Sequence, residues 1–320
     1  MSIRFGILST AKIAKVHVIP AMKRAAHVSV TAIASRDAAR ARKVADDLDI
    51  PVSYGSYEEL LQAPEVDAVY IPLPNHLHVE WAVKALQAGK HVLCEKPIAM
   101  NKADALKLKA EAEQHPGLKV MEAFMYRHHP RWQRAVEIVR SGRLGEIRSV
   151  HSFFSYYNTD PDNYRNKLEM GGGGLMDIGC YPISVARFIF GKEPVSVSGY
   201  SDTDPEFLTD RLTTGMMNFE TGTSVFTCST QTYRDQFVKI HGTKGMMEID
   251  WPFNTDPVKP SILKISTEEG EIRETFEPCN HYTLQAESFA KSILNDTPVE
   301  ISLDDSIANM AVLDKIRDGQ

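Results

Sequence analysis

The sequence has few cysteines and no long apolar run. Its cysteines are widely spaced and form no Cys-x-x-Cys pair, which argues against a disulfide framework or a zinc site. The longest apolar runs fall far short of the roughly 20 residues needed to cross a bilayer. The amino-terminal segment opens directly into a strand-like stretch, without the apolar region of a signal peptide. These absences predict a cytoplasmic protein with no membrane partner. The four cysteines are Cys94, Cys180, Cys228 and Cys279.

The chain also lacks a block of basic residues. It carries 36 lysines and arginines against 42 aspartates and glutamates, a formal net charge of −6. A mildly acidic balance without a basic cluster argues against nucleic acid or an anionic membrane as the main partner. The 320 residues are 43% hydrophobic and 24% charged, which is ordinary for a globular protein. This length predicts about two domains.

The first 125 residues alternate short apolar runs with helix-like segments. Several runs are nearly continuous and rich in β-branched residues, as in parallel strands buried on both faces. This alternation predicts an α/β fold with a doubly wound parallel sheet over residues 1–125, of the type that binds dinucleotides. The expected strands cover residues 3–8, 28–34, 68–71, 91–94 and 119–124, and the expected helices 11–24, 38–48, 56–62, 78–88 and 103–115.

The pattern changes after about residue 125. Between residues 194 and 276, successive strand-like segments separated by turns predict a largely antiparallel sheet. We therefore predict that residues 126–320 form an α+β domain built on an open sheet. Its other expected elements are a strand over 146–157 and helices over 130–141, from the glycine run Gly171–Gly174 to about residue 190, over 282–294 and over 304–316.

The turn after the first strand could hold the pyrophosphate of a dinucleotide. A Gly-x-Gly-x-x-Gly turn places that group on the N-terminus of the following helix. Here Ser9, Ala11 and Ala14 replace the three glycines. Small side chains still allow the backbone to approach a phosphate, although any strand–helix turn favours small residues. The candidate cofactor residues in this turn are Ser9, Thr10, Ala11, Lys12 and Ile13.

The end of the second strand bears on the choice between NAD and NADP. A carboxylate there would bind the ribose hydroxyls of NAD, whereas an arginine can pair with the 2′-phosphate of NADP. Ser35 and Arg36 occupy this end, and Arg40 follows one helical turn later. These arginines could instead form the solvated start of a helix, and Asp37 could cap it. We favour NADP over NAD, with Ser35, Arg36 and Arg40 as its candidate ligands.

Four segments occur in an order and spacing that are specific when taken together. Residues 89–97 read Gly-Lys-His-Val-Leu-Cys-Glu-Lys-Pro, and the other segments are residues 71–78, 122–127 and 171–181. Over essentially its whole length the chain resembles the glucose–fructose oxidoreductase/inositol dehydrogenase (Gfo/Idh/MocA) family, of which Glu-Lys-Pro is a signature. The resemblance implies a Rossmann domain, a nicotinamide cofactor and a sugar, polyol or related carbonyl substrate. It also implies a homodimer or higher homo-oligomer formed through the open sheet.

Lys96, Asp177 and Tyr181 are the candidate catalytic residues. Lys96 follows a buried strand and could simply reach the surface, but the carboxyl end of a parallel strand is where open α/β sheets bind ligands. Asp177 and Tyr181 share a helix face because they are four residues apart, although a helix cap and a core aromatic would give the same spacing. Many family members carry histidine where Tyr181 stands. Tyrosine here resembles the branch of NADP-dependent D-xylose dehydrogenases and dimeric dihydrodiol dehydrogenases, and implies Tyr181 as the acid–base residue assisted by Lys96.

The resemblance implies further contacts to cofactor and substrate. We expect no metal, because the pairs His76/His78 and His128/His129 lack a carboxylate at matching helical spacing. His78 is instead expected to line the nicotinamide end of the pocket or to cap its helix. The substrate candidates are Lys96, Arg165, Asp177 and Tyr181, and the further cofactor candidates are Ile71, Pro72, Leu73, Asn75, His78, Glu95, Lys96, Arg165 and Tyr282.

The leading hypothesis is an NADP-dependent dehydrogenase or reductase that acts on an aldose or similar polyol. One alternative is a glycosidase that uses tightly bound NAD for transient oxidation. Another is a non-catalytic, cofactor-sensing regulator on the same fold. The presence of Lys96, Asp177 and Tyr181 together argues against the regulator, and net formation of NADPH from a free sugar would distinguish the dehydrogenase from the glycosidase.

Overall fold

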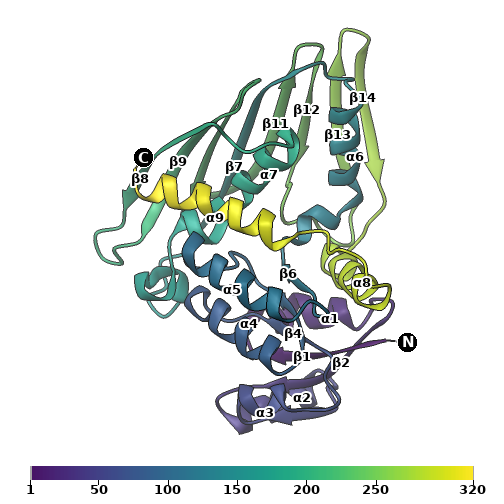
Figure 1. The fold of residues 1–320 in the computed structure, drawn as a ribbon. Helices are drawn as coiled ribbons and strands as arrows, with labels where there is room; N and C mark the ends of the chain where they lie inside the picture. The colour runs from purple at the N-terminus through teal and green to yellow at the C-terminus, as the bar shows by residue number, and fades with distance from the viewer. Residues whose placement is uncertain (1, 320) are drawn as a thin grey trace. The chain divides into compact units, whose positions relative to one another are not determined.

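The computed structural model of the protein describes residues 2–319, which form two compact units (Figure 1). The first contains the chain up to Met125 together with His281–Ile307, and the second contains Tyr126–Asn280 with the residues from Ala308 onward. The predicted domains, residues 1–125 and 126–320, omit the return of His281–Ile307 to the first unit.

The first unit is built on a six-stranded sheet in the order β3-β2-β1-β4-β5-β6, with all neighbours parallel. The strand order reverses between β1 and β4, which is the switch point where doubly wound sheets bind ligands. Its predicted strands are confirmed, and the sequence analysis missed only β3, which has three half-buried residues. The strands are β1 (Ile3–Leu8), β2 (Val28–Ala34), β3 (Val52–Tyr54), β4 (Ala68–Ile71), β5 (His91–Cys94) and β6 (Val120–Glu122).

Side chains cap several helices of this unit. Asp37, Ser56 and Asn101 each accept a backbone N–H from the first turn of the helix that follows, as N-cap residues do. Pro20 cannot donate a backbone N–H, and the helix widens into a π-helix just before it. The helices are η1 (Ala14–Val18), α1 (Ile19–Met22), α2 (Ala38–Asp47), α3 (Tyr57–Leu61), η2 (Asn75–Leu77), α4 (His78–Gln87), α5 (Lys102–Gln114) and α8 (His281–Leu294).

The second unit is built on an eight-stranded sheet in the order β14-β13-β12-β11-β7-β10-β9-β8. Every neighbouring pair is antiparallel except β7 and β10, which confirms the prediction of a largely antiparallel sheet. The strands are β7 (Ile147–Tyr157), β8 (Ser196–Thr203), β9 (Asp210–Asn218), β10 (Thr223–Ser229), β11 (Gln231–Gly242), β12 (Gly245–Asp250), β13 (Ser261–Thr267) and β14 (Gly270–Phe276).

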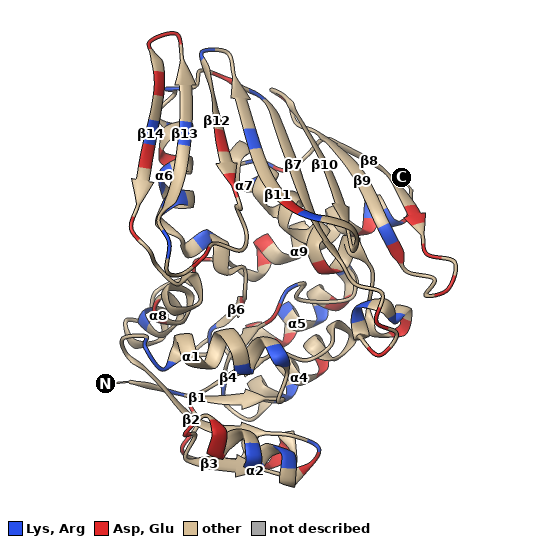
Figure 2. Cartoon of the chain, turned by 180° about the vertical axis from the view of Figure 1, so that it is seen from behind, with Lys and Arg blue, Asp and Glu red and all other residues tan. Residues whose placement is uncertain are grey.

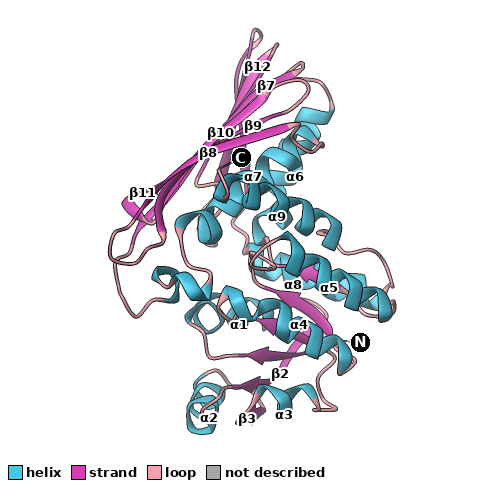
Figure 3. Ribbon diagram, turned by 60° about the vertical axis from the view of Figure 1, so that its left-hand side comes forward, coloured by secondary structure: helices cyan, strands magenta, loops and turns pink. Residues whose placement is uncertain are grey.

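Helices of the second unit cover one face of its sheet, as Figure 3 shows. They are η3 (Met125–His128), α6 (Pro130–Arg140), η4 (Tyr164–Asn166), η5 (Leu168–Met170), η6 (Leu175–Gly179), α7 (Cys180–Phe190) and the latter part of α9 (Leu303–Arg317). Basic and acidic positions are interspersed over both units (Figure 2). No helix within residues 2–319 combines the length and apolarity that a membrane span requires.

Candidate active site

The turn after β1 has the backbone of a glycine turn without the glycine. Ser9 has a φ angle of +123°, a region that L-residues rarely adopt. Its N–H donates to the Ala34 carbonyl at 3.0 Å, and its Oγ accepts the Ala11 N–H at 3.0 Å. The neighbouring backbone therefore holds Ser9 in this conformation. The turn keeps the shape that lets a phosphate approach the N-terminus of the following helix.

The end of β2 presents an arginine rather than a free carboxylate. Ser35 is buried and Arg36 is exposed. Asp37 is the N-cap of α2, because its carboxylate accepts the Arg40 N–H at 3.0 Å. Arg36 is therefore the first exposed charged side chain beyond β2, where a ribose phosphate would lie in this class of domain.

Three of the predicted cofactor residues lie together at the carboxyl edge of the first sheet. Lys96 and Glu95 directly follow β5, and the Glu95 carboxylate accepts the Tyr70 hydroxyl at 2.6 Å. Tyr282, from α8, lies near both residues. Burial and the Glu95 charge raise the pKa of Tyr282, and the Lys96 charge opposes this rise. The return of the chain to the first unit thus brings Tyr282 to the lysine.

His78 joins the two loops that follow β4 and β5. Its ring is fully buried, with Nε2 at 2.8 Å from the Leu73 carbonyl oxygen and Nδ1 at 2.8 Å from the Pro97 carbonyl oxygen. Burial lowers the pKa of His78 to about 4. The expectation that His78 lines the pocket is therefore corrected, because a fully buried ring cannot form its wall. The histidine instead holds the loop that contains Leu73 against the residue after Lys96.

In the second unit, Asp177 and Arg165 form an ion pair. Arg165 Nε lies 2.9 Å from Asp177 Oδ1, and the Tyr156 hydroxyl donates to Asp177 Oδ2 at 2.6 Å. The Asp177 side chain is 7% exposed and that of Arg165 is 30% exposed. Burial and the Asp177 charge both raise the pKa of Tyr156, so the tyrosine remains a donor. Arg165 and Tyr156 thus each bind one oxygen of the Asp177 carboxylate.

Tyr181 is packed in a group of aromatic rings. It is 4% exposed, and its ring centroid lies 5.1 Å from that of Phe253, 5.5 Å from Phe154 and 5.9 Å from Tyr126. Aromatic pairs at such distances restrict the ring to one orientation. The ring of Tyr181 is therefore fixed in direction by its neighbours.

The helical segment that carries Asp177 and Tyr181 is capped by a partly buried carboxylate that the sequence analysis missed. Asp210 Oδ2 accepts the Leu175 N–H at 2.6 Å and the Thr213 hydroxyl at 2.8 Å. Leu175 is the first residue of η6, which runs directly into α7. Asp210, at the start of β9, therefore fixes the beginning of the segment on which both candidate residues lie.

The glycine run Gly171–Gly174 allows parts of the chain itself to come close. A Cβ atom on Gly172 would collide with the Arg165 carbonyl, and one on Gly173 would collide with the Asp210 carboxylate. Gly173 also has a φ of +111°, which favours glycine. The close approaches at this run are thus those of Arg165 and Asp210.

Asp210 should make the stability of the protein depend on pH. Burial raises the pKa of Asp210 to about 6, against the opposing effect of its hydrogen bonds. The folded carboxyl holds its proton more tightly than the unfolded one, so its contribution to stability is greatest below about pH 4 and is lost as the pH rises through about 6. As the pH rises between these limits, we expect the free energy of unfolding of the unaltered protein to fall by up to about 3 kcal/mol relative to that of Asp210→Asn. Urea unfolding of both proteins measures this difference, and parallel pH profiles would contradict it.

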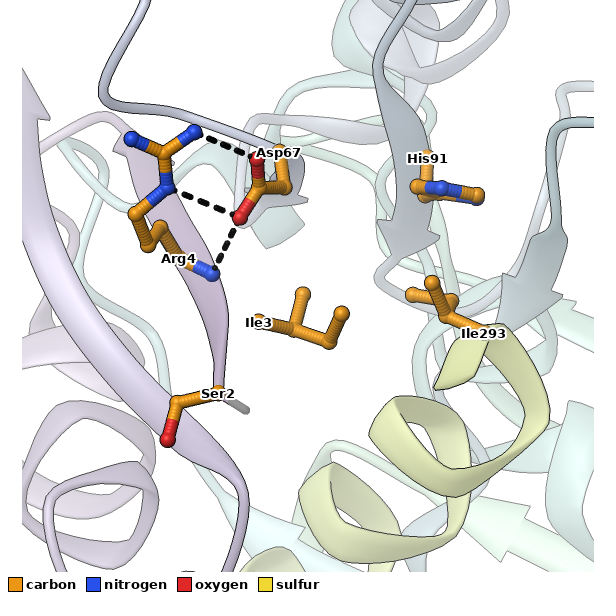
Figure 4. Close-up of a pocket in the computed structure, with 6 residues that line it drawn as sticks. All are labelled: Ser2, Ile3, Arg4, Asp67, His91 and Ile293. Atoms are coloured by element: carbon orange, nitrogen blue, oxygen red, sulfur yellow. Dashed lines mark hydrogen bonds and ion pairs between the residues drawn. The ribbon is translucent and has the colours of Figure 1, made fainter. Parts of the chain in front are cut away.

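A depression with a volume of about 400 Å³ lies at the opposite, amino-terminal edge of the first sheet (Figure 4). Arg4 Nη2 and Nε donate to the two Asp67 oxygens at 2.7 and 2.9 Å, so the main charged groups of its wall bind each other. It is therefore not the candidate active site. Nor do any three His, Cys, Asp or Glu side chains within residues 2–319 gather closely enough to hold a metal ion. The depression is lined by Ser2, Ile3, Arg4, Asp67, His91 and Ile293.

A small-residue turn after β1, an arginine after β2 and a lysine after β5 on a doubly wound sheet are typical of a domain that binds a dinucleotide. Residues 3–124 match the oxidoreductase family with an NAD-binding Rossmann fold, and residues 132–248 match the GFO/IDH/MocA C-terminal domain. The chain belongs to this family of NAD(P)-dependent oxidoreductases.

Individual relatives agree with this assignment. The chain is 39% identical to an NADP-dependent D-xylose 1-dehydrogenase of Haloferax volcanii, over 98% of this chain and 95% of the relative. It is 33% identical to a trans-1,2-dihydrobenzene-1,2-diol dehydrogenase of Bos taurus, over 85% and 80% of the two chains. The solved structure of a 3-ketoreductase from Actinomadura kijaniata, in complex with NADP and TDP-benzene, is similar with a TM-score of 0.93 at 28% identity, covering 100% of this chain and 98% of that one. These relatives match the branch that the sequence indicated.

Proposed function

We propose that the protein is an NADP-dependent oxidoreductase that transfers hydride between the cofactor and a sugar, polyol or related carbonyl compound, as a D-xylose dehydrogenase does. The observation that carries this proposal is the group of Lys96, Glu95 and Tyr282 at the carboxyl edge of a Rossmann sheet. The named activities of the relatives support the substrate class.

Tyr181 is the proposed acid–base residue. The bound nicotinamide accepts or supplies the hydride. Tyr181 takes the proton from the substrate hydroxyl during oxidation and returns it during reduction. A free tyrosine loses its proton only near pH 10, so a base at neutral pH needs a positive charge to stabilise the phenolate. Lys96 supplies that charge, since an ammonium about 4 Å from an anion contributes about 4 kcal/mol at an effective dielectric of 20.

Asp177 orients the substrate in this proposal. Arg165 and Tyr156 hold one carboxylate oxygen each, but every oxygen has a further lone pair that can accept a substrate hydroxyl. Arg165 also neutralises much of the Asp177 charge. This neutralisation matters because an unpaired carboxylate near Tyr181 would oppose loss of the tyrosine proton.

The proposed reaction is tested with a panel of aldoses, polyols and dicarbonyl compounds, each assayed with NADP and with NAD in both directions. We expect net reduction of NADP by at least one aldose or polyol. Oxidation or reduction of the cofactor by none of these compounds would contradict the proposal. Hydrolysis of a glycoside without net change of the cofactor would favour the glycosidase.

Arg36→Ala should narrow the preference for NADP. An arginine–phosphate contact is charge-assisted and contributes about 1.5–3 kcal/mol, or roughly 10- to 150-fold in affinity. We expect this loss in kcat/KM for NADP, through cofactor affinity, with little change for NAD. Steady-state kinetics with both cofactors measures it. Equal kcat/KM for the two cofactors in the unaltered enzyme would show that the preference does not exist.

We also propose that the protein forms a homodimer or larger homo-oligomer through the second sheet. Within the described part of the chain, no helix lies on the outer face of this sheet (Figure 3). Phe153 and Phe237 are paired across β7 and β11 and stack there at 5.8 Å, and Met216 is paired with Val225 across β9 and β10. Met216 is 48% exposed. Such a band of apolar side chains is typical of a surface that another subunit covers.

Light scattering at micromolar protein concentration tests the oligomer. We expect a mass of at least twice the 35.8 kDa of the chain. A charged substitution in the centre of the band, Phe153→Glu, should shift the mass towards 35.8 kDa, whereas Lys43→Glu at an exposed position of α2, in the first unit, should not. A single 35.8 kDa species in the unaltered protein would contradict the proposal.

A further inference from the structure

Asp210 lies against Gly173, at the turn that begins the segment with Asp177. The Gly173 N–H donates to the Arg165 carbonyl at 2.8 Å, and the Gly173 carbonyl accepts the Asp177 N–H at 3.0 Å. A Cβ atom on Gly173 would collide with the Asp210 carboxylate, so the two come as close as glycine allows. The same carboxylate accepts the Leu175 N–H at 2.6 Å. Asp210 thus holds the turn that connects the backbones of Arg165 and Asp177.

Two hydroxyl groups from neighbouring strands hold the Asp210 carboxylate in place. The Thr213 hydroxyl donates to Asp210 Oδ2 at 2.8 Å, and the Ser201 hydroxyl lies 2.8 Å from that of Thr213. Because the single proton of the Thr213 hydroxyl points to the carboxylate, Thr213 accepts a hydrogen bond from Ser201. Ser201 and Thr213 are paired across β8 and β9. The sheet therefore fixes the carboxylate, and a fixed acceptor at a helix start restricts the first helical turn.

We propose that Asp210 is a positioning residue for the reaction. This inference rests on the proposed function. By holding the first N–H of η6 and the Gly173 turn, the carboxylate sets the place of Asp177 and, through the ion pair, that of Arg165. Tyr181 follows on the same run of helix, since η6 continues directly into α7. Asp210 acts through these residues and not on the substrate itself.

Steady-state kinetics of Asp210→Ala and Asp210→Asn at pH 7 tests the proposal. Alanine removes the acceptor of the Leu175 N–H, whereas asparagine keeps an oxygen that can accept both hydrogen bonds. We expect Asp210→Ala to lower kcat about 10- to 100-fold, because small displacements of reacting groups cost factors of this size. KM for NADP should be unchanged, since the candidate cofactor turn lies in the other unit. Asp210→Asn should restore kcat to within about twofold of the unaltered value.

Asp204→Ala is the matched control. Asp204 lies between β8 and β9, shortly before Asp210, and is 7% exposed. Its carboxylate accepts the Glu206 and Phe207 N–H groups at 2.8 and 2.9 Å and the Gln231 amide at 2.8 Å. None of these partners belongs to η6. The variant should therefore lose stability but keep kcat within about twofold of the unaltered value.

Two further variants extend the test. Thr213→Val removes one hydrogen bond to the Asp210 carboxylate with little change of shape, and it serves if Asp210→Ala does not fold. It should lower kcat by about 3- to 10-fold. In a Tyr181→Phe background, Asp210→Ala should cause little further loss of kcat, because both substitutions impair one proton transfer. General damage to the fold would instead multiply the two losses.

Hydrogen–deuterium exchange examines the same segment without any substrate. We expect residues 171–181 to exchange faster in Asp210→Ala than in the unaltered protein, in Asp210→Asn or in Asp204→Ala. Unchanged exchange or unchanged kcat in Asp210→Ala would overturn the role of Asp210, as would an equal loss of kcat in Asp204→Ala or a full further loss in the Tyr181→Phe background. If the unaltered protein reduces NADP with no substrate, the proposed function itself fails, whereas the exchange result still shows whether Asp210 holds the segment.

Discussion

Replacing Tyr181 with phenylalanine is expected to lower kcat by about 10²- to 10⁴-fold, the usual contribution of general acid–base catalysis. The substitution removes only the hydroxyl and keeps the ring in its aromatic surroundings, so the fold should be unaffected. Cofactor binding should remain nearly unchanged, because Ser9 and Arg36 lie in the other unit. Lys96→Met should reduce kcat at least as much, since the phenolate then loses its stabilising charge.

Tyr126→Phe is a control for this prediction. Tyr126 belongs to the same group of rings, and its hydroxyl lies 2.7 Å from the Ser184 hydroxyl. Losing that hydroxyl should lower kcat by less than about tenfold, which is a smaller loss than removal of a general base causes. Retention of more than about a tenth of kcat by Tyr181→Phe would remove Tyr181 from the acid–base role.

Asp177→Asn is expected to cost about 3 kcal/mol of folding stability, the lower end of the range for breaking a buried ion pair. The substitution leaves Arg165 with no negative partner at this position while its side chain is only 30% exposed. It should also reduce activity, because Asp177 would no longer orient the substrate. Chemical unfolding of the variant and the unaltered protein at pH 7 measures the stability difference.

Two further variants separate the loss of the pair from a general effect of lost charge. The double variant Asp177→Asn/Arg165→Met should recover part of the stability, because it leaves no uncompensated charge. Asp46→Asn breaks an exposed pair with Arg42, whose side chains are 60% and 70% exposed, and should cost less than about 1 kcal/mol. Equal losses for Asp177→Asn and Asp46→Asn would contradict the importance of the buried pair.

The first sheet could be read from the sequence because its strands are buried on both faces. The predicted bounds of β1, β2, β4 and β5 agree with the structure, since each is a continuous apolar run between helices. β3 has only three half-buried residues and gives no comparable signal. The return of α8 to the first unit could not be predicted, because it depends on packing between residues more than 250 positions apart, such as Thr283 and Ala21.

The candidate site shows the same division between local and distant information. Lys96 and the Asp177/Tyr181 pair follow from short motifs and from helical spacing. Asp210 and Tyr156 lie 33 and 21 residues from Asp177, and only the three-dimensional pairing of strands and helix brings them to the segment that carries Asp177 and Tyr181. Asp210 stands in a polar stretch of the sequence, where nothing local distinguishes it from other aspartates. Tyr156 lies on a strand that was predicted correctly, but its contact with Asp177 could not be read from that strand.

The most direct test of the account follows the transferred hydrogen itself. The unaltered protein is incubated with NADP and aldoses that carry deuterium at C1, and the reduced cofactor is analysed by mass spectrometry. We predict that NADPH carrying one deuterium accumulates in equal amount to the oxidised sugar, and that Tyr181→Phe forms it at least about a hundredfold more slowly. If no aldose of the panel yields net deuterated NADPH, the proposal that the protein is a dehydrogenase of this class is contradicted.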